Sequence, residues 1–246
     1  MENRALRRLY EHPDTPRAIG SDPAAYQARV VADVLARRGG ARVLLDVGCG
    51  DGTTAEVLRA CLATEGSRPF IAGVDWSSVA ATAAGRRGFA VVRGTADDGR
   101  LPFRSESVDV VVVSEMIEHV VDTDAVLEEA RRVLVPGGAL VLSTPNLAAW
   151  YNRALLAVGV QPVFSEVSLR GIYGRPGREV VGHLRLFTRR ALSELLAASG
   201  FEEVGIVGAP YHDVPRPFRP LDRLLCRTPG LASILVAAAR KAGPGR

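Results

Sequence analysis

The fold is decided by the segment LLDVGCGDGTTA, residues 44–55. An apolar run over residues 42–47 predicts a buried strand, and Gly48, Gly50 and Gly52 follow it immediately before a predicted helix. Glycines at a strand-to-helix turn let the backbone approach a ligand where a Cβ atom would clash. The following helix presents unpaired N–H groups to the same space. The segment therefore predicts a ligand-binding loop at the carboxyl end of a strand.

Two aspartates accompany this loop. Asp46 lies at the end of the predicted strand, and Asp75 follows Gly52 by 23 residues, at the end of a second apolar run. An acidic residue entering the loop disfavours the pyrophosphate bound by the dinucleotide spacing GxGxxG, and it suits a sulfonium or an ammonium group. A carboxylate at the position of Asp75 can accept hydrogen bonds from ribose hydroxyls. The alternative is a tight strand-to-helix turn in which the two aspartates have no binding role. It explains less well why the glycine loop, the order of the strands and the second aspartate all fit one ligand-binding pattern.

The rest of the chain alternates between strands and helices. Apolar or β-branched runs predict further strands over residues 70–75, 89–94, 108–114, 139–144 and 201–208. Helices are predicted over residues 22–38, 53–63, 78–87, 123–134 and 188–199. Buried apolar strands separated by helices predict an α/β fold with a parallel sheet covered on both faces.

Some stretches depart from this alternation. The Pro-Gly-Gly sequence at residues 136–138 predicts a turn before the strand at residue 139. Residues 147–182 and 209–230 have no clear hydrophobic period, so we interpret them as insertions. The apolar run at residues 233–240 fits either a helix or a strand.

Composition excludes several classes of protein. Hydrophobic residues make up 47% and charged residues 24% of the 246-residue chain, which predicts a folded protein rather than a disordered one. Cys49, Cys61 and Cys226 are widely spaced and form neither a disulfide framework nor a metal-binding motif. The first residues lack the apolar centre of a secretory signal, and no run of about 18 apolar residues occurs. We therefore expect a cytoplasmic protein.

The net charge of +4 is unevenly distributed along the chain. Residues 1–145 carry 17 basic and 20 acidic side chains, whereas residues 146–246 carry 14 and 7. Part of this excess falls in the insertions 147–182 and 209–230, each with four arginines and two acidic residues. Because aromatic residues are not interleaved with the arginines, no nucleic-acid partner is expected. The basic insertions instead favour an anionic or phosphate-bearing acceptor.

The chain resembles the class I S-adenosylmethionine-dependent methyltransferases over about residues 30–208. Besides LLDVGCGDGTTA, the resemblance lies in VDWS (74–77), GTADDGRLPF (94–103), VDVVVVSEMIEHV (108–120), LVPGGALVLSTPN (134–146) and GHLRLFTRRALSELLAASGF (182–201). It implies a Rossmann-like, doubly wound sheet of seven mostly parallel strands. The last strand would be antiparallel, and SILVAAARK at residues 233–241 fits that role.

The same resemblance implies one methyltransferase domain over residues 1–246. Its parts would be an N-terminal arm and helix (1–40), a cofactor-binding core (41–146), a lid insertion (147–182) and the rest of the sheet (183–246), which includes a second lid insertion (209–230). Both insertions leave the carboxyl ends of strands, where open α/β sheets bind ligands. We therefore expect the two insertions, together with the arm, to roof a substrate pocket.

The resemblance also implies which residues bind S-adenosylmethionine. Asp46, Gly48, Cys49 and Gly50 would line its methionine part, Asp75 would hold its ribose, and Trp76 would lie against its adenine. Ala96, through its backbone, and Asp97, through its side chain, would contact the adenine edge, and Ser114 the amino-acid part. One departure is Thr95, which stands where the family often has Asp.

Methyl transfer to a hydroxyl requires removal of a proton, and histidine suits this near neutral pH. His119 follows the strand 108–114 in SEMIEHV and is the first candidate base; His183 is the second. The alternatives are that His119 packs or caps the next helix and that His183 is a hydrogen-bonded loop residue. Glu115 and Glu118 either orient the imidazole or face solvent.

No metal ion is expected, because Asp122 and Asp124 are interpreted as helix-capping residues. Three functions remain open from the sequence. The first is O-methylation of a small-molecule acceptor such as a metabolite, quinone, sugar or lipid-linked compound. The second is methylation of RNA by the basic C-terminal part, and the third is cofactor binding without catalysis. The amphipathic, basic stretch Leu221–Leu225 is interpreted as a lid helix, with contact to a membrane surface as the alternative.

Overall fold

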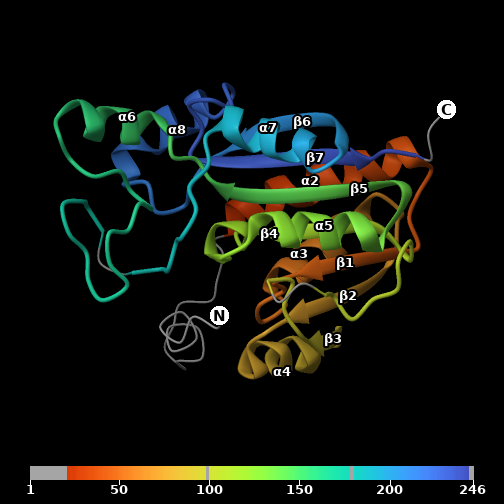
Figure 1. Cartoon of the computed structure of the whole chain (residues 1–246). Helices are drawn as coiled ribbons and strands as arrows, with labels where there is room; N and C mark the ends of the chain where they lie inside the picture. The colour runs from red at the N-terminus through yellow and green to blue at the C-terminus, as the bar shows by residue number, and fades with distance from the viewer. Residues whose placement is uncertain (1–20, 98–99, 178–179, 244–246) are drawn as a thin grey trace.

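A computed structural model describes residues 21–97, 100–177 and 180–243 and contains one seven-stranded sheet of order β3-β2-β1-β4-β5-β7-β6 (Figure 1). The strands are β1 (Val43–Val47), β2 (Phe70–Asp75), β3 (Ala90–Arg93), β4 (Val108–Ser114), β5 (Leu134–Pro145), β6 (Phe201–Ala209) and β7 (Ile234–Lys241). Strands β1 to β5 pair in parallel, whereas β7 is antiparallel to both β5 and β6. The predicted fold class is confirmed, and the ambiguous run near residue 234 is the antiparallel strand.

Helices cover both faces of the sheet. They are α2 (Ser21–Arg38), α3 (Thr53–Thr64), α4 (Ser78–Arg86), α5 (Thr123–Val133), α6 (Trp150–Ala157), α7 (Arg189–Ala198) and α8 (Arg219–Leu225), with short 3₁₀ helices η1 (Ile117–His119) and η2 (Arg216–Phe218). Helices α5 and α7 lie in front of the sheet in Figure 1, and α2 and α3 lie behind it. The predicted N-terminal arm falls on residues 1–20, outside the described residues.

The central strands are largely apolar because both of their faces are buried. Leu45 and Val111 point into the cluster that contains the buried side chains of α5 and α7. Their neighbours Leu44 and Val110 point into the opposite cluster, with α2 and α3. This two-sided burial explains why β1 and β4 were readable as uninterrupted hydrophobic runs.

Two local predictions need correction. The Pro-Gly-Gly sequence does not form a separate turn: β5 already begins at Leu134 and passes through it, with a register shift opposite residues 108–110 of β4. Gly137 has φ +69°, which glycine tolerates, so the strand can bulge there without ending. The other correction is α6, which lies inside the insertion 147–182. This helix has no side-chain N-cap and buries only Asn152, so the sequence carried no periodic signal for it.

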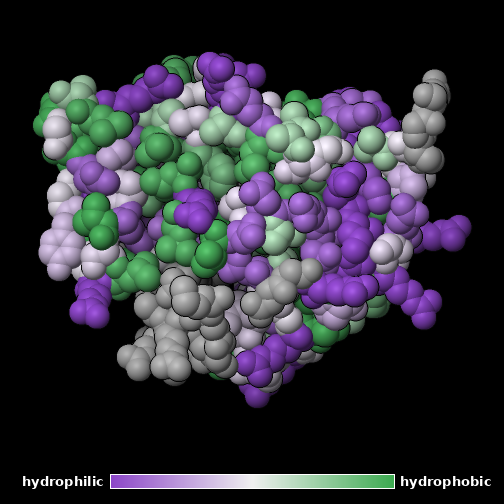
Figure 2. All heavy atoms as spheres, in the orientation of Figure 1, coloured by the Kyte–Doolittle hydropathy of each residue, from purple (hydrophilic) through white to green (hydrophobic). Residues whose placement is uncertain are grey.

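The two insertions pack against one another beyond the carboxyl ends of the strands, at the left of Figure 1. The Trp150 indole donates a hydrogen bond of 2.9 Å to Asp222, and the rings of Phe164 and Tyr211 meet edge to face at 5.0 Å. Figure 2 shows apolar residues gathered around α6, where Leu156 is more than half exposed. In the part of the chain that the structure describes, none of the helices is long and apolar enough to cross a membrane.

A substitution at Gly208 of β6 tests how tightly the second insertion packs on the sheet. A Cβ atom there would lie 2.3 Å from the Cys226 carbonyl oxygen and 2.5 Å from the Ala232 Cβ. Gly208→Ala should therefore lower the free energy of unfolding by about 1–3 kcal/mol, because the added methyl overpacks the contact. Gly205→Ala in the same strand has no neighbour within 4 Å and is the matched control. Urea denaturation of both variants measures the effect, and equal stability would refute the packing argument.

Candidate active site

The glycine loop after β1 folds against the end of β2. The N–H groups of Gly48 and Cys49 donate to the Val74 carbonyl at 2.8 and 3.1 Å. Gly48 has φ +76°, and a Cβ atom there would lie 2.5 Å from the Met116 side chain. Gly50 also has positive φ, but a Cβ atom there would meet nothing within 4 Å. The first glycine is thus required by packing, and the second leaves open space beside the loop.

Asp75 links the glycine loop to the start of α4. Its Oδ2 accepts a 2.8 Å hydrogen bond from the Gly50 N–H, and its Oδ1 accepts one of the same length from the Ser77 N–H. These two bonds fix the Asp75 carboxylate beside the glycine loop. The structure brings Asp75 to the glycine loop, as the spacing predicted.

Asp46 lies in β1 with 1% exposure, and neither of its carboxylate oxygens has a hydrogen-bond partner among the described residues. Burial, and secondarily the charge of Asp75, raises the pKa of Asp46 to about 7. A buried carboxylate without compensation is costly when ionised. The loop therefore has, at its base, a group whose ionised form a cationic ligand would stabilise.

Two other predicted cofactor residues differ in what they offer. The Cys49 side chain turns toward β2 and packs on Gly73. A Cβ atom at Gly73 would lie only 2.7 Å from the Cys49 Sγ. The Cys49 side chain is buried, and burial raises the pKa of its thiol well above its usual range. Trp76 is half-buried, and its carbonyl oxygen accepts a 3.1 Å hydrogen bond from Arg93.

Ala96 is buried after β3, and the neighbouring Asp97 makes a structural contact that the sequence did not reveal. The Asp97 carboxylate accepts hydrogen bonds of 2.8 to 3.2 Å from the N–H groups of Val121 and Asp122. It therefore ties the loop after β3 to the start of α5. A contact between Asp97 and adenine stays a prediction, and it would have to share these oxygens.

Ser114 ends β4 and is hydrogen-bonded to Gln27 of α2, a residue that sequence reasoning missed. The fully buried Gln27 side chain accepts from the Ser114 hydroxyl and donates to the carbonyls of Val113 and Val141. A lone amide on the apolar side of the predicted helix 22–38 was the available signal. Gln27 anchors α2 at the carboxyl end of β4.

Glu115 directly follows β4 in a strained conformation. Its φ is +47°, which a non-glycine residue adopts only when its surroundings hold it there. Its Oε1 is buried with no hydrogen-bond partner in the described chain, and burial raises its pKa to about 7. The alternative that Glu115 faces solvent is therefore wrong.

Glu118, His119 and His183 come together although 64 residues separate the histidines. The two imidazole rings lie 4.7 Å apart, and Glu118 Oε1 is 3.8 Å from His119 Nε2. The Glu118 side chain is 1% exposed, and its Oε2 accepts a 3.0 Å hydrogen bond from the Thr144 hydroxyl. Glu118 thus lies beside the imidazole, and the solvent-facing alternative is wrong for it as well.

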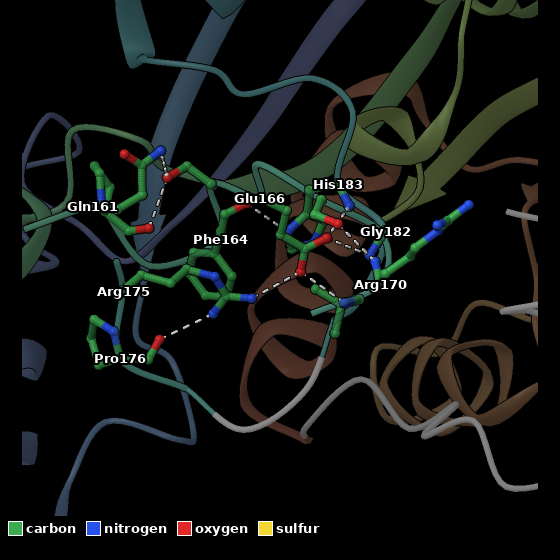
Figure 3. Close-up of polar contacts among 12 residues, drawn as sticks. Gln161, Phe164, Glu166, Arg170, Arg175, Pro176, Gly182 and His183 are labelled. Carbon is green, nitrogen blue, oxygen red and sulfur yellow. Dashed lines mark hydrogen bonds and ion pairs between the residues drawn. The ribbon is translucent and has the colours of Figure 1, made fainter. Parts of the chain in front are cut away.

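Glu166 sets the position of His183 and was not recognised from the sequence (Figure 3). Its buried carboxylate accepts hydrogen bonds from the N–H groups of Val181, Gly182 and His183 at 2.7 to 3.1 Å. It also accepts from Arg175 at 2.9 Å. The Gly182 carbonyl held in this way lies 3.1 Å from His119 Nδ1. The first insertion therefore fixes the backbone of His183, which directly follows it, and orients His119.

Burial keeps both histidines neutral. It lowers the pKa of His119 to about 3, helped by the neighbouring His183, and the pKa of His183 to about 4. Burial, and secondarily the charge of Glu115, raises the pKa of Glu118 well above its usual range. A proton on either imidazole alone would be held weakly. The predicted bases are thus brought together, but in an environment that makes each imidazole a weak base.

The arginines of the insertions serve partly as internal ties. Arg175 is paired with Glu166, and Arg153 donates to the carbonyls of Ala148 and Gly230. Arg219 of α8 donates to the carbonyls of Val214 and His212. The predicted preference for an anionic acceptor therefore rests on the remaining arginines and stays a prediction.

Comparisons with known proteins agree with this architecture. A family model for a methyltransferase domain matches residues 22–205. A probable S-adenosylmethionine-dependent methyltransferase of Mycobacterium tuberculosis is 32% identical over 183 residues, which are 73% of this chain and 56% of that protein. A ubiquinone biosynthesis O-methyltransferase of Chelativorans sp. is 28% identical over 188 residues, covering 73% of this chain and 67% of that protein. The chain spans little more than half the length of the mycobacterial relative.

Solved structures share the same fold. A structure described as an S-adenosylmethionine-dependent methyltransferase from Thermotoga maritima, a possible histamine N-methyltransferase, superposes with a TM-score of 0.55 and 22% identity. The match covers 88% of this chain and 92% of that one, and at this identity it supports the fold alone. From the family model, the relatives and the strand order together, the chain belongs to the class I S-adenosylmethionine-dependent methyltransferases.

Proposed function

We propose that this protein transfers the methyl group of S-adenosylmethionine to a hydroxyl oxygen of a small-molecule acceptor. The observation that carries the proposal is the arrangement of two sets of side chains at one edge of the sheet. The glycine loop with Asp46 and Asp75 forms one set. Glu118, His119 and His183 form the other.

The first set fits S-adenosylmethionine by its chemistry. When bound, this cofactor supplies a methyl group on a positively charged sulfur. Asp46 offers a buried carboxylate whose oxygens have no partner in the described chain, and such a group is stabilised by a cation. The Asp75 carboxylate lies beside the loop, at the strand end where such a group accepts hydrogen bonds from ribose hydroxyls, and Gly50 leaves space where a side chain would intrude. We assign these three residues to the cofactor.

The second set fits an acceptor that must lose a proton. In the transfer, an oxygen–carbon bond forms, the sulfur–carbon bond breaks, and its electron pair stays on sulfur. The hydroxyl proton would be held between His119 Nε2 and Glu118 Oε1, which lie 3.8 Å apart. Glu118 is the stronger proton acceptor of the two, because burial and the charge of Glu115 raise its pKa well above its usual range, whereas burial lowers the pKa of His119. The pair would therefore serve as the base better than His119 alone.

Two further observations favour oxygen as the atom methylated. The segment after β4 reads Ser-Glu-Met-Ile, whereas enzymes that methylate nucleobase or glutamine nitrogen use Asn-Pro-Pro-Tyr there. Relatives named as ubiquinone biosynthesis O-methyltransferases are 28% identical. A small acceptor also suits the predicted pocket beneath the two insertions, which pack on one another.

The direct test supplies methyl-labelled S-adenosylmethionine with a panel of phenols, quinols, sugars and metabolite extract, followed by mass analysis of labelled products. An O-methylated small molecule is the expected result. His119→Gln and His183→Gln should reduce turnover while leaving cofactor affinity unchanged. Label found in RNA would favour the nucleic-acid alternative. Cofactor binding without any transfer would favour a non-catalytic role.

Asp75→Ala should weaken binding of S-adenosylmethionine on the order of 100-fold. The reason is that the two hydrogen bonds that the ribose hydroxyls would donate to the charged Asp75 carboxylate are lost. Isothermal titration calorimetry measures the effect. Asp109→Ala is the matched control, since Asp109 also accepts two backbone N–H bonds, from Arg42 and Val43, but at the amino end of β1. An equal loss of affinity in both variants would mean that Asp75 acts only through stability.

Cofactor affinity should depend on the ionisation of Asp46. With a pKa raised to about 7, Asp46 is largely protonated at pH 6 and largely ionised at pH 8. Since a cation binds the ionised form, affinity for S-adenosylmethionine should rise about tenfold over this interval. Asp46→Asn should bind more weakly at pH 8 and show a flat profile when titrated across the same range. A wild-type profile that is equally flat would exclude Asp46 from the cofactor site.

A further inference from the structure

The cluster of Glu118, His119 and His183 has the composition of a metal site. One potential ligand atom from each side chain lies within 4.8 Å of the other two. Glu118 and His183 are buried, and the His119 side chain is 17% exposed. The cluster thus combines two imidazole nitrogens and one carboxylate oxygen in a small, largely dry space.

The hydrogen bonds around the two rings select the tautomer that a metal ion requires. His119 Nδ1 lies 3.1 Å from the Gly182 carbonyl, and His183 Nδ1 lies 3.0 Å from the Phe164 carbonyl. Because a carbonyl oxygen only accepts, each Nδ1 carries the proton and each Nε2 carries a lone pair. Metal-binding histidines are usually oriented in this way, with the other ring nitrogen bonded to a carbonyl or carboxylate.

The carboxylate of Glu118 provides an independent observation. Thr144 fixes its Oε2, while Oε1 points toward His119 and has no hydrogen-bond partner within the described residues. Glu115 lies close enough to repel Glu118, and its Oε1 is also buried without a partner there. Two such oxygens beside two neutral imidazoles form an arrangement that a divalent cation would stabilise.

The scaffold around the cluster is already arranged for binding. Glu166 holds the backbone of residues 181–183 through three hydrogen bonds, as Figure 3 shows, and is itself paired with Arg175. The Glu118 carbonyl accepts from the N–H groups of Leu184 and Arg185, which fastens the other end of the same segment to η1. Ligands and the groups that orient them are therefore positioned by packed structure rather than by a free loop.

We propose that Glu118, His119 and His183 bind one divalent first-row transition-metal ion, such as Mn²⁺, Fe²⁺, Co²⁺ or Zn²⁺. Two imidazoles favour these ions over Mg²⁺ and Ca²⁺, which prefer oxygen ligands. Three protein ligands leave coordination positions for an acceptor oxygen, as in catalytic rather than structural metal sites. This conclusion replaces the expectation from sequence that no metal is bound.

The role of the ion rests on the proposed function. A hydroxyl oxygen that bonds to the ion has a lowered pKa, so it releases its proton to solvent at neutral pH and becomes the nucleophile. In this arrangement His119 and His183 act as ligands, and the pair His119–Glu118 is not needed as a base. The acceptor would then be a molecule with a hydroxyl that reaches the ion, a phenol or an enol being the best suited because its proton is already acidic.

The test measures metal binding directly on the full-length chain after removal of metal with EDTA. Titration with Co²⁺ should give visible absorption bands that saturate at one ion per chain and are displaced by Zn²⁺. Glu118→Gln and His183→Gln should each weaken Co²⁺ binding about 100-fold or more, since loss of even an outer contact costs 10–100-fold. His212→Gln is the matched control, because His212 is paired with Asp213 outside the cluster.

Circular dichroism and affinity for S-adenosylmethionine verify that each variant is folded. A rise in the thermal midpoint of the wild-type protein with Co²⁺, reversed by EDTA, supports the site even where a variant does not fold. Absence of Co²⁺ binding at millimolar concentration would overturn the proposal. So would unchanged Co²⁺ affinity in both folded cluster variants.

Methyl-transfer assays test the role of the metal ion separately from the proposed methylation. Undiminished methyl transfer by EDTA-treated protein overturns the role of the ion and leaves methylation standing. Cluster-dependent Co²⁺ binding without transfer to any acceptor overturns the proposed methylation and leaves the ion site standing. Transfer that requires added metal and is lost in Glu118→Gln supports both.

Discussion

Buried negative charge at the carboxyl edge of the sheet is the constraint around which this structure is organised. Asp46, Asp75, Glu115 and Glu118 lie at or just beyond the ends of β1, β2 and β4; Glu115 is half-buried, and the other three are buried. Burying a carboxylate is unfavourable unless hydrogen bonds or positive charge compensate it. Asp75 is compensated by backbone N–H groups, whereas the others keep oxygens without partners in the described chain. The edge as a whole is selective for positively charged ligands.

Much of the first set of side chains could be predicted because it is local in sequence. The glycine loop and Asp46 lie within one strand-to-helix turn, and Asp75 follows at the end of the next strand, so parallel pairing alone brings them together. The central strands β1 and β4 were predictable for a related reason: burial of both faces favours runs of apolar residues. For these residues, the local sequence pattern and the three-dimensional fold lead to the same prediction.

The second set could be predicted only in part, because it depends on contacts between distant segments. His119 and His183 were recognisable as candidates, but their approach is set by Glu166, which lies in an aperiodic insertion. No spacing rule connects a carboxylate to three backbone N–H groups some fifteen residues away. The contacts of Gln27 and Asp97 could not be predicted for the same reason, since each side chain bonds a backbone group far along the chain. The sequence revealed which residue types could react, and tertiary packing determined their neighbours.

The hydrogen bonds of Glu166 have a consequence for how this protein can diversify. They close the base of an Ω-loop and leave its middle, with exposed Tyr173, outside the closure. Loop tips accept insertions and substitutions readily when the ends of the loop are held. Residues at the tip can therefore change without moving His183. Natural variation can therefore change the middle of this loop while the position of His183 stays fixed.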